Sequence, residues 1–385
     1  MASKPQAYPL VIILFMGLGI FLLNSCGPDK EKIETIKEDG IEVVINHLEP
    51  YKTGEKSSFT FEKRWSIDTE NPEIQKLGLM DIRGFEVNSA GEIFVLGELS
   101  SEGNLIFKFD KDRQFIKSFG HQGQGPGEVE APFHISLDGQ ENIMVSDSSR
   151  QLVVIYDSDG SFVKNQMMPA GGMMTASGPQ GRLLIMGTSG ETFWLKLVDS
   201  DFLEIKTLDE FIMEMPRTTK FRATPPVFAW SSSRDNIYVG KEDRGYEIHV
   251  FDADGQLIRK IRKDYKKVPV SESYKEKILK MFPPGMREMA VFPDFQPPFQ
   301  SLMAADNGML FVCTFEEGHN PGEFMFDIFD KDGVFIGRTS LNVFIWEGHL
   351  WARLKDNKFY YLMEKDSGYK EIGRASCRER VYHPV

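Results

Sequence analysis

Alternating apolar and polar residues flank a short acidic turn at five places in the chain. The copies read FKFDKDRQFIKSF around Asp110, VIYDSDGSFVKN around Asp157, KLVDSDFLEIKT around Asp199, HVFDADGQLIRKI around Asp252 and DIFDKDGVFIGR around Asp330. Period-two alternation on both sides of a turn rich in Asp and Gly is typical of antiparallel strands joined by a tight hairpin. We therefore predict that the same β-hairpin recurs along the chain.

The acidic turns also resemble calcium loops. A helix-loop-helix calcium site needs a bidentate Glu about twelve residues after its first Asp, but Lys263 occupies that region after Asp252. Turn chemistry explains the acidic residues without a metal. The hairpin is favoured, and calcium stays open as an alternative.

A second repeated element consists of a strand, a polar turn and an apolar triplet. The triplets begin at Ile93, Ile143, Leu184, Ile237, Leu310 and Phe359, at spacings of 50, 41, 53, 73 and 49 residues. A period of about 40 to 50 residues with four short strands is the signature of propeller blades. The sequence predicts an all-β fold, a six-bladed β-propeller of four-stranded antiparallel blades; a β-sandwich pair is the alternative.

The long spacing and the two ends of the repeat array need separate explanations. An insert at 263–297, between blades 4 and 5, contains SESYKEKILKMF, which predicts a short helix capped by Ser271. The sixth repeat lacks its outer strand, and SSFTFEKRWSI near 57–67 is an unpaired strand pattern. We expect this N-terminal strand to close the last blade, because closure removes an exposed sheet edge.

Residues 1–25 have the pattern of a signal peptide. Lys4 precedes the apolar run PLVIILFMGLGIFLL, and LNSC follows it. The LNSCG ending resembles a bacterial lipobox, which implies lipidation of Cys26; an uncleaved anchor helix is the alternative. Residues 26–56 are charged and predict a solvated tether.

We expect that the residues after Lys370 do not belong to the natural protein. EIGRASCRERV can be reverse-translated into a common sequencing-adapter string, so we interpret 371–385 as an adapter artefact and place the propeller at 57–370. Cys313 lies in a strand pattern and is predicted to be buried, which leaves no disulfide framework.

A net charge of −12 argues against a nucleic-acid partner. The Gly-rich stretch near Gly125 lacks a following Gly-Lys-Ser/Thr and precedes a strand, so it does not support phosphate-loop chemistry.

The junction of the first two repeats resembles a known family. FGHQGQGPGEVEAPFHISLDGQENIMVSDSSRQLVVIYDSDGSFVKN, at 119–165, resembles the NHL repeat in its Gly-Pro-Gly-Glu turn, Pro132, Val-Ser-Asp segment and Asp hairpin. The layout over residues 26–370 is similar to the six-bladed β-propeller lipoproteins of Bacteroidota. The resemblance implies an exported protein, lipid-anchored to the outer membrane on its periplasmic or cell-surface side, more firmly than it implies an activity.

Ligands of propellers usually bind where the innermost strands meet around the central channel. Nine or ten residues before each triplet lie Arg83, His134, Met174, Phe228, Gln300 and His349. These side chains predict a site for a polar or anionic ligand, with Arg83 as a fork donor; the alternative is that they only fill the channel. We expect a monomer that binds an unidentified small molecule, glycan or protein.

An enzyme is the alternative function, as a metal-dependent hydrolase or lyase of the lactonase-like or amidating-lyase-like kind. The His residues show no close metal-ligand spacing. Calcium or zinc is therefore unsupported, and no catalytic residue, metal ligand or cofactor is assigned. The nearest channel carboxylates are Glu86 and Glu347. The Met- and Phe-rich insert could cover the channel mouth or form a partner surface, but packing of these residues against the propeller is favoured. The Trp residues are candidates for stacking on sugars, although a core position is favoured for most of them: Trp65, Trp194, Trp230, Trp346 and Trp351.

Overall fold

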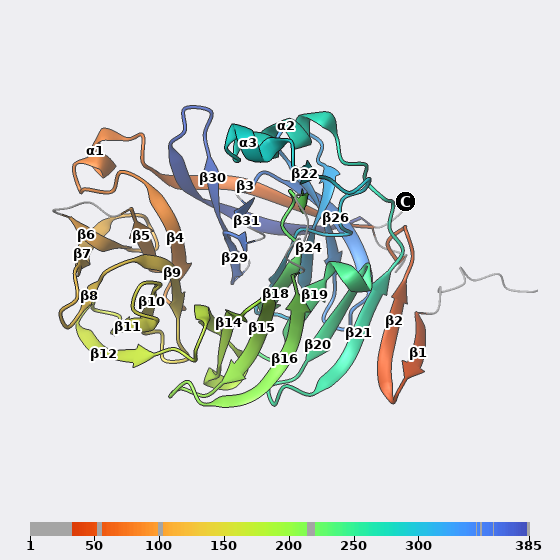
Figure 1. Cartoon of the computed structure of the whole chain (residues 1–385), viewed down its shortest axis with the longest axis horizontal. Helices are drawn as coiled ribbons and strands as arrows, with labels where there is room; N and C mark the ends of the chain where they lie inside the picture. The colour runs from red at the N-terminus through yellow and green to blue at the C-terminus, as the bar shows by residue number, and fades with distance from the viewer. Residues whose placement is uncertain are drawn as a thin grey trace, which may run out of the picture.

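The computed structural model describes residues 33–51, 56–98, 103–213, 220–343, 345–346, 349–356 and 358–382. These residues form six large β-sheets, the blades, which follow one another around a common centre (Figure 1), and two further sheets of two strands each. Each blade has four antiparallel strands, A to D, counted outward from the centre, and the sheets of blades 1 and 4 include additional strands at their outer edges. The six-bladed β-propeller predicted from the repeat spacing is confirmed.

The strands of the blades are named here in blade order, 1 to 6. The A strands are β4 (Ile82–Val87), β9 (Pro132–Leu137), β13 (Gly172–Ser177), β18 (Phe228–Ser232), β23 (Ser301–Ala304) and β29 (Ala352–Lys355). The B strands are β5 (Ile93–Gly97), β10 (Ile143–Asp147), β14 (Leu183–Ser189), β19 (Ile237–Lys241), β24 (Leu310–Glu317) and β30 (Lys358–Glu364). The C strands are β6 (Asn104–Phe109), β11 (Leu152–Tyr156), β15 (Thr192–Val198), β20 (Glu247–Phe251), β25 (Phe324–Phe329) and β31 (Lys370–Tyr382). The D strands are β7 (Phe115–Gln122), β12 (Phe162–Met167), β16 (Glu204–Ile212), β21 (Leu257–Lys263), β26 (Phe335–Leu341) and β3 (Lys56–Asp68). Two-residue strands lie between or beside the blades: β8 (Glu128–Val129), β27 (Ile345–Trp346) and β28 (His349–Leu350).

The acidic turns join strands C and D, as predicted. In each turn the first Asp accepts hydrogen bonds from two backbone N–H groups; at Asp252 these come from Asp254 and Gln256, at 2.9 and 2.8 Å. The same pair of bonds occurs at Asp110, Asp157, Asp199 and Asp330. The carboxylate therefore caps the turn. This role explains, without a calcium ion, why an Asp recurs at the first position of each of these turns.

An N-terminal strand closes the ring, and this prediction is confirmed. β3 is the outer strand of blade 6 and pairs with β31 in antiparallel register, with Ile67 opposite Ile372. The C-terminal limit of the propeller at residue 370 is wrong, because residues 371–382 belong to β31 and Ile372 and Ala375 are buried. Their alternation of apolar and polar residues suits a strand with one buried face. The adapter origin of these residues stays a prediction.

The N-terminal tether is shorter than predicted. Within 26–56, strands β1 (Glu34–Glu38) and β2 (Ile41–Asn46) form a hairpin, and β2 extends blade 4 by pairing in parallel with β21. Val43 and Val44 are buried, and Glu38 and Glu42 form ion pairs with Arg262, Lys260 and Arg259 of β21. Burial and charge pairing together explain why this charged segment is ordered.

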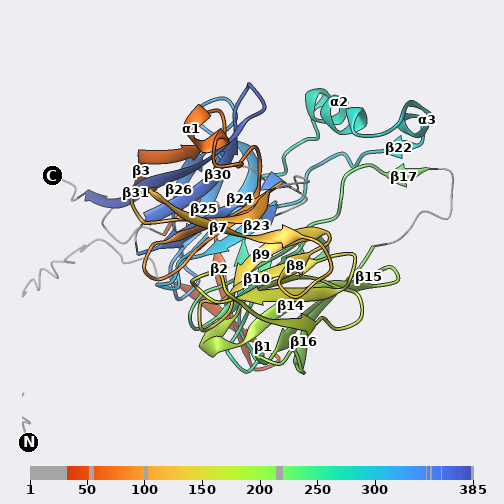
Figure 2. The same cartoon turned by 90° about the vertical axis from the view of Figure 1, so that its left-hand side faces the viewer.

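The insert between blades 4 and 5 contains the predicted helix. α2 (Glu272–Lys280) begins at Ser271, whose Oγ accepts a hydrogen bond from the backbone N–H of Tyr274 at 3.2 Å. α3 (Pro284–Arg287) and β22 (Ala290–Val291) follow, and β22 pairs with β17 (Phe221–Arg222), which precedes blade 4. Figure 2 shows this small unit standing clear of the blades.

The apolar core lies within and between neighbouring blades. Its largest fully buried side chains are mostly Phe and Tyr, such as Phe85, Phe109, Phe311 and Tyr360, and Cys313 is fully buried as predicted. The short helix α1 (Pro72–Gln75) links β3 to β4. Among the helices of the described residues, none has the length and apolar character needed to cross a bilayer. The predicted signal peptide and Cys26 lie outside the described residues.

Candidate functional site: the central channel

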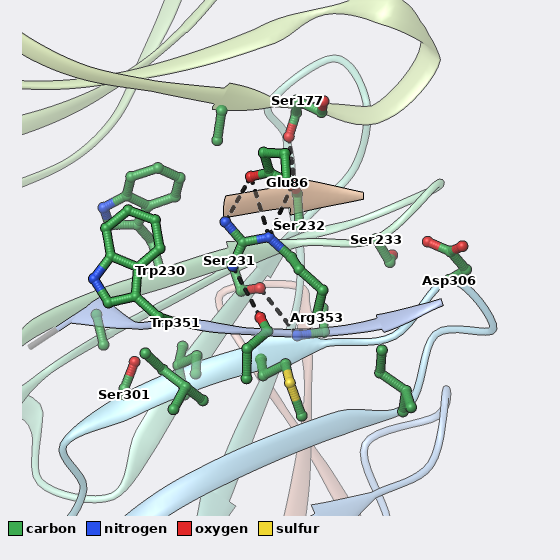
Figure 3. A pocket seen from close by; sticks show the side chains of 18 of the residues that line it. Glu86, Ser177, Trp230, Ser231, Ser232, Ser233, Ser301, Asp306, Trp351 and Arg353 are labelled. Atoms are coloured by element: carbon green, nitrogen blue, oxygen red, sulfur yellow. Dashed lines mark hydrogen bonds and ion pairs between the residues drawn. The ribbon is translucent and has the colours of Figure 1, made fainter. Parts of the chain in front are cut away.

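A cavity of about 270 Å³ lies on the central axis, and the A strands of all six blades line it. Figure 3 shows Trp230 and Trp351 at one end, Ser233 and Asp306 at the other, and Arg353 between them. The aromatic residues lie near the beginnings of the A strands, and the polar residues lie where these strands turn into the B strands. The channel therefore has an aromatic end and a polar mouth.

The aromatic end is built around Trp351. Its ring lies 5.3 Å from the imidazole of His134, centroid to centroid, with an interplanar angle of 33°. The ring also packs on the backbone of β4, where a Cβ at Gly84 would lie 2.5 Å from the indole. Trp230 and Phe228 of β18 complete this end, and the Nε1–H of Trp230 is buried without an acceptor in the described part of the chain. This end of the channel is therefore mainly aromatic and apolar.

A charged pair crosses the middle of the channel. Arg353 of β29 donates from Nε to both carboxylate oxygens of Glu86 at 3.1 Å, and from Nη2 to Oε1 at 2.6 Å. Its Nη1 donates to the carbonyl of Ala352 at 2.8 Å. Burial acts to lower the pKa of Arg353, but the Glu86 carboxylate outweighs it and holds that pKa above its ordinary value. The pair joins blade 6 to blade 1 in its charged form.

Hydroxyl groups near the mouth join the other A strands. Ser177 Oγ donates to the carbonyl of Leu137 at 2.5 Å, and Ser232 Oγ donates to the carbonyl of Ser177 at 2.5 Å. Ser231 Oγ accepts from the backbone N–H of Ala304 at 2.9 Å. These bonds fix the spacing of blades 2 to 5 and leave oxygen lone pairs facing the axis region.

Two more cations lie at the mouth. Lys355 Nζ donates to the carbonyl of Val87, and Arg234 lies 3.8 Å from Asp306 at the rim. Together with Arg353, three Lys and Arg side chains face two carboxylates along this lining. The channel lining thus carries more positive than negative side chains, whereas the chain as a whole is acidic.

The structure brings together only part of the predicted site. His134 and Phe228 line the channel, as does Glu86. Arg83 does not: it is exposed, donates to the carbonyl of Pro132 at 3.2 Å and lies 3.8 Å from Glu98. Gln300 is also wrong as a channel residue, because it is buried beside blade 5 and donates to the carbonyl of Thr314 at 2.6 Å.

An irregular strand start explains the error at Arg83. β4 pairs Ile82 with Gly97 and then Gly84 with Leu96, so Arg83 is the extra residue of a β-bulge. Met174 follows a similar bulge in β13 and lies in the apolar core between blades. One extra residue reverses which side chains face inward, so counting back a fixed number of residues fails. The side chain of His349 lies outside the described residues.

Arg353 and the serine hydroxyls were not predicted from the sequence. The segment HLWARLKDNKF places Trp351 and Arg353 two residues apart, and side chains at that spacing share one face of a strand. This spacing was the feature of the sequence that could have placed Arg353 beside Trp351 in the channel.

The described residues contain no group of three His, Cys, Asp or Glu side chains that could hold a metal ion. Glu86 uses both oxygens to bind Arg353, which does not suit a general base. Glu347, the other candidate, lies outside the described residues.

A comparison with protein families agrees with this architecture. Residues 79–208, which span the first three blades, match a family described as 6-bladed beta-propeller. No curated protein matches the sequence. Among solved structures, a Bacteroides fragilis protein described as exported is 13% identical with a TM-score of 0.49, covering 87% of this chain and 99% of that one. A Bacteroides vulgatus member of the duf4221 family is 12% identical with a TM-score of 0.49, covering 91% and 100%. Virginiamycin B lyase from Staphylococcus aureus is 10% identical with a TM-score of 0.40, covering 83% and 99%.

Proposed function

We propose that this protein is an exported, lipid-anchored propeller that binds a small hydroxyl-rich ligand, of the size and polarity of a sugar, in its central channel. The observation that carries this proposal is the axial cavity of about 270 Å³, with an aromatic end, a charged pair and a hydroxyl-lined mouth. Binding sites for small molecules combine apolar and aromatic walls with a few placed polar groups in this way.

The aromatic end suits the apolar face of a sugar ring. The ring of Trp230 lines the cavity and is half-buried, and the buried Trp351 lies beside it. A half-buried aromatic ring gains apolar contact area when the apolar face of a sugar covers it.

The charged pair can position the hydroxyl groups of the ligand. A guanidinium carries five N–H donors, and the acceptors of Arg353 are two oxygens of Glu86 and the carbonyl of Ala352. Donors remain on Nη1 and Nη2, on a side chain that keeps 26% of its surface accessible. Serine oxygens on the neighbouring A strands supply acceptors.

Titration calorimetry of the mature protein against monosaccharides, disaccharides and their uronic acids tests the ligand class. We expect at least one member to bind and Trp230→Ala to weaken it about tenfold through loss of the aromatic surface that lines the cavity. Phe162→Ala is the control, because Phe162 is exposed on β12, away from the channel. Absence of binding across the panel, or equal affinity in Trp230→Ala, would rule out this ligand class.

The anchor is supported by the lipobox-like LNSCG before the first described residue. Detergent phase partitioning tests it: the protein made in a bacterial host should enter the detergent phase, and Cys26→Ser should stay in the aqueous phase. Partitioning that does not depend on Cys26 would exclude lipidation at this residue.

A further inference from the structure

The propeller has two faces with different contents. In an antiparallel blade, the A-to-B and C-to-D turns share one face, and the B-to-C turns and D-to-A connections share the other. Arg234 and Asp306, in A-to-B turns, put the channel mouth on the first face, called the mouth face. The insert connects strand D of blade 4 to strand A of blade 5 and so lies on the opposite face, called the insert face.

The N-terminal chain reaches the propeller on the insert face. β1 begins at Glu34, which pairs with Ile45, and Ile45 pairs with Arg262 near the end of β21. His47 connects the two segments: its Nδ1 lies 3.0 Å from Asp264, where the insert begins, and its Nε2 lies 3.4 Å from Glu34.

The distance to the anchor is limited by covalent geometry. Glu34 lies eight positions after Cys26 in the sequence, and eight residue steps of fully extended chain span at most about 28 Å. A lipid on Cys26 would therefore hold the insert face close to the bilayer.

The insert face also carries exposed apolar side chains. Met281, Met286, Val291 and Phe295 are exposed on the insert, and Ile33 and Leu48 are exposed beside Glu34. Lys267 Nζ lies 5.4 Å from the centre of the Phe295 ring. Residues 264–298 contain six Lys and Arg against five Asp and Glu, in a chain of net charge −12. Apolar side chains with neighbouring lysines are typical of surfaces that lie in the headgroup region of a bilayer.

We propose that the insert is a membrane-contacting element, which inserts its exposed Met and Phe side chains into the headgroup region and holds the channel mouth away from the bilayer. This inference rests on the lipid anchor of the proposed function. Its consequence is that ligand reaches the channel from the side opposite the membrane.

Two labelled variants of the full-length lipoprotein test the orientation. Met281→Cys lies on the insert face and Leu203→Cys on the mouth face, and the native side chains are matched in exposure, at 63% and 66%. Both carry Cys377→Ser; Cys313 is buried, and lipidation blocks Cys26. After labelling with an environment-sensitive dye, each protein is reconstituted into vesicles of phosphatidylethanolamine and phosphatidylglycerol.

We expect dye emission at position 281 to rise at least about twofold on reconstitution and to be quenched by nitroxide lipids, because the label enters the headgroup region. Emission at position 203 should not change. Quenching at 203, or at neither position, in protein that partitions into detergent through Cys26 would overturn the orientation and leave the anchor intact. Protein that does not partition through Cys26 would overturn both.

Discussion

The Glu86–Arg353 pair shows how two charged side chains in the channel couple neighbouring blades. Glu86 is almost inaccessible to solvent and belongs to blade 1, whereas Arg353 belongs to blade 6. Each charge therefore stabilises the other across the contact between blade 6 and blade 1.

Breaking this pair should destabilise the protein strongly. Arg353→Met leaves a buried carboxylate without its cation, for which we expect a loss of about 3 kcal/mol in the free energy of unfolding, measured by urea denaturation. Arg234→Met is the control, because its pair with Asp306 is long and Arg234 is 71% exposed, so its effect should stay below about 1 kcal/mol. The double variant Glu86→Gln with Arg353→Met should regain part of the loss. Equal stability of Arg353→Met and Arg234→Met would contradict the argument.

His249 should make stability depend on pH. Burial, then the nearby Arg244, lower its pKa to about 4, although Glu247 acts in the opposite direction. Its folded pKa lies below the unfolded value of about 6.5, so the unfolded state binds more protons between these values. Stability is then full above about pH 6.5 and falls by about 3 kcal/mol as pH drops to about 4.

Urea denaturation at several pH values measures this dependence in wild type and His249→Gln. The variant should lose less stability than wild type between pH 7 and 5, because it lacks the imidazole of His249. The contribution of the carboxylates remains in both proteins. His121→Gln, at an exposed position on β7, should follow wild type. The same slope in all three proteins would refute the assignment to His249.

Site residues were only partly predictable from the sequence. His134 and Phe228 lie on the channel, whereas Arg83 is the extra residue of a bulge in β4; β9 has a similar bulge, but its extra residue is Phe133, directly before His134. A bulge depends on local backbone geometry that a spacing rule does not contain. The pairing of Glu86 with Arg353 joins positions 267 residues apart, which only the closed ring brings together.

At the scale of elements, the β1–β2 hairpin joins two blades through one side chain. Asn46 Nδ2 donates to the carbonyl of Gly333 at 3.0 Å, and Asn46 Oδ1 accepts from the backbone N–H of Phe335 at 2.7 Å. Since β2 lies on blade 4 and Phe335 begins strand D of blade 5, Asn46 holds the hairpin and both blades in one unit.

Replacing Asn46 should loosen this junction. Asn46→Ala leaves the buried Phe335 N–H without its acceptor, which should cost about 2 kcal/mol. Hydrogen exchange should show faster exchange in β1, β2 and the start of β26, with blades 1 and 2 unchanged. His47→Ala is the neighbouring control, because its ion pairs are exposed and should contribute little. Uniform exchange across the ring in Asn46→Ala would argue against a local role.

The regular elements could be read from the sequence, and the hairpin was missed. Period-two alternation located the B, C and D strands, and Ser271 located the start of α2. In IKEDGIEVVIN the charged residues suggested a tether, although Asp39-Gly40 is a strong hairpin signal. Both residues have positive φ, 52° and 85°, as such a turn requires. The decisive interactions, the pairs with β21, are long-range and leave no local pattern.

At the scale of the whole molecule, the ring depends on pairing its two ends. The number of blades follows from the repeat spacing, but closure requires β3 to pair with β31, about 300 residues later in the chain. The register extends from Lys56 opposite Tyr382 to Asp68 opposite Glu371. An open ring would expose a row of backbone donors and acceptors on β31 and would uncover Ile67, which is almost fully buried.

Removing residues 33–68 should therefore open the ring, whereas removing only residues 33–48 should keep it closed. We expect the larger deletion to form concentration-dependent oligomers through the free edge of β31 and to melt at lower temperature. The smaller deletion removes the β1–β2 hairpin but keeps β3, so it should stay monomeric with a smaller loss of stability. Light scattering after size exclusion measures the mass of each species, and calorimetry measures the transitions. If both deletions gave monomers of equal stability, pairing of β3 would not be what closes the propeller. Oligomers from the smaller deletion alone would place the vulnerable edge on blade 4 instead.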